Sequence, residues 1–151
     1  MEKKLKTIDV VKAYNVLSKA KYQKLQNEDM IKVWRIQQKL KHYALEFDEA
    51  KKDAEDKLLP EDFMKDYQKA LVYESKMKKG ELDLPMTEQE HSAFIVKLQK
   101  YNTLIKKALE ELENKEVSID FNPIVEVAFA DLMSSNEWTF EDADAISFII
   151  E

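Results

Sequence analysis

The segment from Asn27 to Leu58 constrains the fold more than any other part of the sequence. Its apolar residues follow one another at alternating steps of three and four, the spacing of a coiled-coil-like helical seam that faces a partner helix. These residues are Val33, Ile36, Leu40, Tyr43, Phe47, Ala50 and Ala54. Asn27 is a favourable N-cap, and Pro60 ends the pattern because proline disfavours helical geometry in the residue before it. The segment therefore predicts one long helix.

A second segment repeats this pattern further along the chain. Thr87 and Glu90 have the capping-box spacing, in which each side chain satisfies the other's free backbone N–H group at a helix start. The apolar seam that follows consists of Phe94, Leu98, Tyr101, Ile105, Ala108 and Leu112. Because both long helices carry the same seam, we expect them to pack antiparallel and to build most of the core together.

Two shorter helices are expected beside the long ones. Thr7 is predicted to cap a helix that runs to about Lys21 and carries one apolar stripe. Another helix should follow Pro60 and stop at Gly80, the only glycine in the chain. The sequence thus predicts a mainly α fold, an antiparallel bundle of about four helices.

The pattern changes beyond residue 114. Val117, Ile119 and Phe121 alternate with polar residues, which is typical of a short strand. Such a strand must pair with another segment or with another chain. Residues 124–133 leave strand and helix open, although Pro123 favours helix, and Thr139 is predicted to cap a last short helix.

Charge is distributed unevenly along a chain whose net charge is -6. Residues 1–58 contain 14 basic and 10 acidic side chains, whereas residues 116–151 contain nine acidic and no basic ones. A length of 151 residues suits one domain, in which we expect a helical bundle (7–114) followed by an acidic strand and helix extension (115–151). The interpretation that we favour is a solvated acidic surface. The alternative is that opposite ends attract one another, within one fold or between stacked subunits.

Composition argues against several enzyme classes and cofactor sites. A chain with one glycine cannot build the glycine-rich phosphate loops of Rossmann or P-loop enzymes, and without cysteine it lacks the usual zinc sites. Glu88 and His91 have the Glu-x-x-His spacing of di-iron bundles, but no second such pair exists at His42. A triad or carboxylate pair assembled from distant residues stays open. We expect no enzyme activity, no cofactor and no metal.

Two further partner classes are not expected. The only arginine is Arg35, whereas base and phosphate recognition usually depends on the bidentate arginine fork. We therefore expect no specific nucleic-acid binding. No stretch reaches the roughly 20 continuous apolar residues that a membrane span requires. The expected partners are therefore other protein chains, including copies of this one.

Six residues are candidates for contact with such partners. They are Trp34, Trp138, Phe140, Glu141, Asp142 and Asp144. Trp34 falls beside two seam positions, so it either fills the core, which we favour, or faces a neighbour. The aromatic pair near the C-terminus precedes an acidic helix in a loop-like stretch, and aromatic residues dominate interface hot spots.

Three stretches near the two ends of the chain carry a family resemblance. They are Val10–Leu17 (VVKAYNVL), Glu116–Phe121 (EVSIDF) and Thr139–Ile146 (TFEDADAI). Together they resemble a family of small uncharacterised proteins of tailed bacteriophages. The resemblance includes no catalytic signature. It implies a bacteriophage origin, with an accessory role in the virion, in its assembly or in the cytoplasm of the infected bacterial cell.

Two functions are compatible with these observations. The favoured one is a non-enzymatic helical protein–protein interaction module, a phage structural or accessory component. The alternative is an acidic inhibitor or nucleic-acid mimic that binds a basic site on a host protein, because residues 116–151 lack lysine and arginine. Neutral replacement of the three acids at 141, 142 and 144 separates the two.

Overall fold

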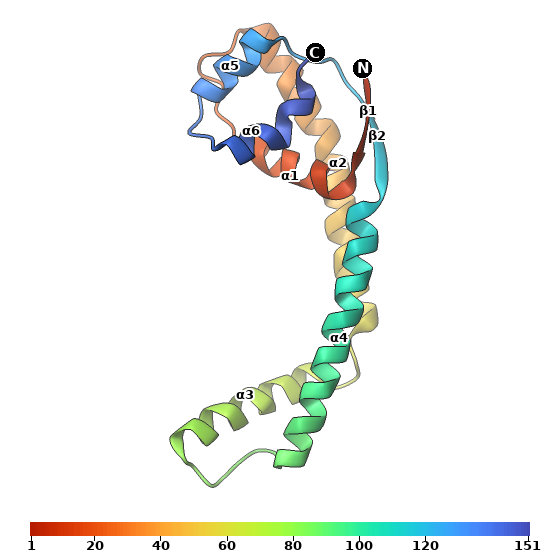
Figure 1. The fold of residues 1–151 in the computed structure, drawn as a ribbon, viewed down its shortest axis with the longest axis vertical. Coiled ribbons are helices and arrows are strands. Elements are labelled where there is room, and N and C mark those ends of the chain that lie inside the picture. Colours follow the sequence, from red (N-terminus) through yellow and green to blue (C-terminus); the bar gives the residue numbers. More distant parts are fainter. The chain divides into compact units, whose positions relative to one another are not determined.

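The computed structural model describes all residues from Met1 to Glu151 and confirms a mainly α fold (Figure 1). The helices are α1 (Thr7–Ser18), α2 (Asn27–Leu58), α3 (Phe63–Lys79), α4 (Glu88–Asn114), α5 (Glu126–Ser134), α6 (Phe140–Ile146) and the short 3-10 helix η1 (Ser147–Ile149). The strands are β1 (Glu2–Lys6) and β2 (Glu116–Asp120). None of the helices combines the length and the apolar composition needed to cross a membrane.

Local sequence signals determine most helix boundaries as predicted. Helix α2 spans the predicted range, and α4 follows the predicted capping box. In that box the Thr87 N–H donates to Glu90 Oε1 (3.2 Å) and the Glu90 N–H donates to Thr87 Oγ1 (3.1 Å). Gly80 ends α3 with a φ of +70°, which glycine adopts without the steric cost of a Cβ atom. Residues 124–133, left open above, are mostly helical.

The predicted strand forms, and the N-terminus supplies its partner. Strands β1 and β2 pair antiparallel, with Lys3 opposite Ile119 and Leu5 opposite Val117. No strand was predicted at β1, because Leu5 is the only apolar side chain within it. The expected Thr7 cap is wrong. Thr7 is the first helical residue, and both its N–H group (2.8 Å) and its hydroxyl (2.7 Å) donate to the carbonyl oxygen of Lys115.

The chain divides into two compact units. Unit 1 consists of residues 1–51 and 111–151, and unit 2 consists of residues 52–110. Each unit has its own hydrophobic core, and no buried residue belongs to both. This differs from the predicted division into a bundle (7–114) followed by an extension (115–151), because the C-terminal residues are part of the larger core.

The core of unit 1 is built from both ends of the chain. Its buried apolar residues are Val10, Ala13, Leu17, Leu25, Val33, Ile36, Leu40, Ile119, Phe121, Ile124, Ala128, Phe129, Leu132, Ala143, Ile146 and Ile149. Nine of these sixteen lie between residues 119 and 149, and none lies in α4. The prediction that the seams of the two long helices build most of the core together is therefore wrong. The apolar C-terminal segment instead covers the first half of the α2 seam, Val33, Ile36 and Leu40.

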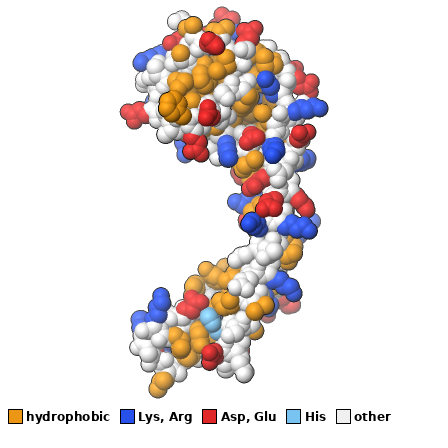
Figure 2. Space-filling view, in the orientation of Figure 1, with side chains coloured by type: hydrophobic (Ala, Val, Ile, Leu, Met, Phe, Trp, Pro, Cys, Tyr) orange, Lys and Arg blue, Asp and Glu red, His pale blue; other side chains and the backbone are white.

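Unit 2 has a small aromatic core. Phe63 of α3 packs against Phe94 and Tyr101 of α4, with ring centroids 5.5 and 5.0 Å apart. The Tyr101 hydroxyl donates to the carbonyl oxygen of Glu55 (3.1 Å), and desolvation together with the nearby Glu55 and Asp56 carboxylates raises the pKa of Tyr101. Many apolar side chains of this unit remain at the surface, and Figure 2 shows hydrophobic patches on the face in view. They include Met64, Leu71, Val72, Met77, Leu82, Val96 and Leu104.

Asn136 joins two loops of unit 1. Its Oδ1 accepts from the Lys21 N–H (2.7 Å), and its Nδ2 donates to the carbonyl oxygens of Lys21 (3.0 Å) and Leu132 (2.8 Å). Asn136→Ala is expected to lower the free energy of unfolding of unit 1 by about 1–3 kcal/mol, because three hydrogen bonds are lost. Urea denaturation followed by tryptophan fluorescence measures this, since both tryptophans lie in unit 1.

The variant Asn136→Asp is the matched comparison for this prediction. It keeps an acceptor for the Lys21 N–H but turns a carboxylate oxygen toward the carbonyl oxygens of Lys21 and Leu132, so it should be at least as destabilised as the alanine variant. An alanine variant as stable as the wild type would contradict the role of Asn136.

Candidate protein-binding groove

A groove in unit 1 lies between helix α2 and the turn that follows β2. Its cavity volume is about 250 Å³. The lining residues are Lys32, Trp34, Arg35, Ile36, Gln38, Lys39, Phe121 and Asn122. Ile36 and Phe121 are buried core residues, whereas Trp34 is 54% exposed. The groove therefore has an apolar base that is continuous with the core and a large aromatic side chain that water reaches.

The helical repeat of α2 explains why Trp34 is at the surface. The buried residues of α2 are Val33, Ile36, Leu40 and Ala44, and they lie along one stripe. A residue next to a stripe position is rotated by about 100° around the helix axis, so Trp34 leaves the core face. The interpretation of Trp34 as core filling is therefore wrong. A half-exposed tryptophan beside an apolar cavity is typical of an anchor for a partner.

Positive charge surrounds the groove. Lys32, Arg35 and Lys39 follow one another at steps of three and four, which places them on the same side of α2. No carboxylate lines the groove, and neither Lys32 nor Arg35 forms an ion pair within the chain. The Lys39 ammonium group donates to the carbonyl oxygen of Asp120. Two cations are thus available to an acidic ligand at this site.

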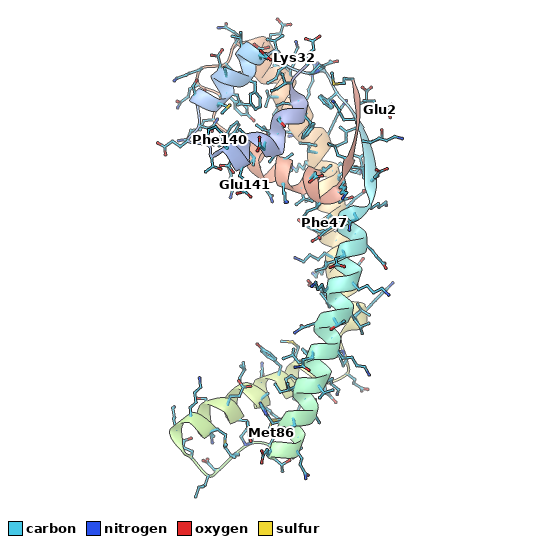
Figure 3. The ribbon with its side chains drawn as sticks, viewed as in Figure 1. Glu2, Lys32, Phe47, Met86, Phe140 and Glu141 are labelled. Atoms are coloured by element: carbon cyan, nitrogen blue, oxygen red, sulfur yellow. The ribbon has the colours of Figure 1, made fainter.

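The C-terminal contact candidates lie elsewhere in unit 1. Trp138 is partly buried against the core, whereas Phe140, the first residue of α6, is 86% exposed. Figure 3 shows Phe140 and Glu141 together at the start of α6, and Lys32 at a separate place on α2. None of the C-terminal candidates lines the groove, so the structure does not bring the six predicted residues into one site.

The three acidic candidates differ in their surroundings. Asp142 belongs to the predicted cap of α6. Its Oδ2 accepts from the Thr139 N–H (3.2 Å), while its own N–H donates to Thr139 Oγ1 (3.2 Å). Glu141 and Asp144 are exposed and form no ion pair. Only these two carboxylates are free to meet a partner.

Each of the two histidines lies beside a single carboxylate. His91 Nε2 lies 3.1 Å from Glu74 Oε1 and stacks on Tyr73 with ring centroids 4.5 Å apart, so its carboxylate neighbour is not Glu88. His42 Nε2 lies 3.2 Å from Glu46 Oε1. No three His, Asp or Glu side chains form a cluster suited to a metal ion.

The groove could not be predicted from the sequence, because it forms only when the end of β2 packs beside α2, and these segments are far apart in the chain. One signal could have suggested it, namely that the only arginine of the chain follows Trp34 directly. Arginine and tryptophan are the residues most enriched at interface hot spots. No protein-family model, curated protein or solved structure matches this chain.

Proposed function

We propose that this chain is a non-enzymatic protein–protein interaction module that binds partner proteins through the Trp34 groove. The half-exposed tryptophan over an apolar cavity is the observation that carries the proposal. The side chain supplies a large contact area with few rotatable bonds, and the buried Ile36 and Phe121 behind it provide a firm base.

The charges of the groove define the partner's chemistry. Lys32 and Arg35 have no carboxylate of their own, so a partner with acidic side chains beside an apolar one satisfies them. Electrostatic attraction of this kind speeds association and suppresses basic partners. The proposed ligand is therefore an acidic segment that presents an aromatic or large aliphatic residue.

The proposed biological setting is a structural or accessory component of a bacteriophage, acting in the virion, in its assembly or in the infected cell. The resemblance of residues 10–17, 116–121 and 139–146 to phage proteins supports it. The alternative of a nucleic-acid mimic has weaker support, because Asp142 is engaged in the helix cap and Asp120 accepts a bond from the N-terminal amino group (3.3 Å).

A peptide-binding measurement tests the proposed function. The probe is a short fluorescein-labelled peptide in which one phenylalanine is flanked by glutamates, and the readout is fluorescence anisotropy at low salt. Trp34→Ala is expected to weaken binding by about 30-fold, which corresponds to the roughly 2 kcal/mol of an interface hot spot.

Two control peptides and one control variant accompany this test. Peptides with lysines in place of the glutamates, or with alanine in place of phenylalanine, should bind much more weakly. Leu45→Ala removes another exposed apolar side chain of α2 outside the groove and should leave affinity unchanged. Failure of the wild type to bind the acidic phenylalanine peptide would refute the proposed function.

A further inference from the structure

We infer that the occupant of the groove is Phe140 of a second copy of this chain, with Glu141 and Asp144 opposite Lys32 and Arg35. The inference rests on the proposed function, because it assumes that the groove binds protein. It adds the identity of the partner and of the segment that enters.

The start of α6 presents Phe140 as a fixed projection. The side chain is 86% exposed, the highest value of any aromatic residue in the chain. The capping box of Thr139 and Asp142 fixes the backbone on either side of it. Ala143 and Ile146 of the same helix are buried, and α6 packs against α1. Because the segment is already ordered, docking it costs little conformational entropy.

The charges of this projection complement those of the groove. Asp144 lies four residues after Phe140, on the same face of α6, and Glu141 is the next residue in the sequence. Neither carboxylate has an ion-pair partner within the chain, and the same holds for Lys32 and Arg35. Two free anions next to an exposed ring thus match two free cations next to an apolar cavity.

The contact joins two molecules. Phe140 and the groove both belong to unit 1, yet Phe140 does not line the groove, and Figure 3 shows it apart from Lys32. Core packing of α6 holds Phe140 where it is, so it cannot reach the groove of its own chain. Two copies can exchange projections as a closed two-fold pair, or each copy can bind different neighbours in a ring or an open chain.

Sedimentation velocity over a range of concentrations tests the inference. The wild type is expected to self-associate at low salt and to dissociate as salt screens the exposed charges. Phe140→Ala should raise the apparent dissociation constant by about tenfold or more. Because Phe140 is exposed, this variant should keep the circular dichroism spectrum and the melting temperature of the wild type.

A charge-swap experiment identifies the two contacting surfaces. One variant carries Lys32→Glu with Arg35→Glu, and the other carries Glu141→Lys with Asp144→Lys. Each alone should remain monomeric, and an equimolar mixture should associate, because the acidic and basic surfaces match again only between the two variants. Lys41→Glu, an exposed change on α2 outside the groove, is the control and should associate like the wild type.

The outcomes separate this inference from the proposed function. A wild type that stays monomeric at low salt, or self-association unaffected by Phe140→Ala and by both charge variants, overturns the inference. If the groove nevertheless binds the acidic phenylalanine peptide, the proposed function stands with a partner other than this chain. If it binds no such peptide, the proposed function fails as well.

Discussion

Leu132→Ala is expected to lower the free energy of unfolding of unit 1 by about 2–5 kcal/mol, because a leucine in a closed core leaves a cavity when it is shortened. Leu132 lies on α5 and is 0% exposed, among side chains from α1, α2 and α6. The loss is large against the 5–15 kcal/mol that typical domains possess, so the C-terminal segment should behave as core rather than as an appended tail.

Urea denaturation followed by tryptophan fluorescence measures this effect, since both Trp34 and Trp138 lie in unit 1. Val127→Ala is the matched control. Val127 is on the same helix but largely exposed, so its shortening should change stability by less than about 0.5 kcal/mol. Equal effects of the two substitutions would contradict the placement of α5 in the core.

Phe94→Ala should have a comparable effect on unit 2 and leave unit 1 intact. Phe94 is the only buried residue of α4, and its ring packs against Phe63 and Tyr67. Removing a buried phenylalanine costs about 3–5 kcal/mol. The core of unit 2 contains only five buried residues, so we expect the variant to lose the packed structure of this unit altogether.

Limited trypsin digestion detects this loss, because α3 carries many lysines that become accessible when the aromatic core opens. The fluorescence transition of unit 1 should stay where it is in the wild type. Val96→Ala changes an exposed residue of α4 and should leave the digestion rate unaltered. If Phe94→Ala also shifts the fluorescence transition of unit 1, the two units unfold together.

Elements with strong local signals could be predicted from the sequence. Capping residues at 87 and 139, Gly80 after α3 and the proline after α2 each act within a few residues, so the helix bounds were close to those observed. Helix α1 ends at Ser18, a little before the predicted Lys21. These features depend on backbone geometry that the neighbouring residues alone determine.

Contacts between distant segments could not be predicted in the same way. Strand β1 exists because β2 pairs with it from the far end of the chain, and its own residues are mostly lysine. The apolar seam of α2 could pack against the seam of α4 or against the apolar C-terminal segment, and its spacing does not distinguish between them. Trp34 was misplaced for the same reason, since an apolar residue beside a seam becomes buried or exposed according to the width of the covering surface.

Unit 1 is built from two separate stretches of the chain, so it should fold after unit 2 when the chain is diluted from denaturant. Unit 2 is one continuous stretch of the chain. Unit 1 is complete only when Glu2 has paired with Asp120 and Ile124 with Ile150. Structures with high contact order form slowly, because the entropy of bringing distant residues together is lost before their contacts stabilise the fold. The refolding chain is therefore expected to assemble its α3–α4 hairpin before either tryptophan reaches a native environment.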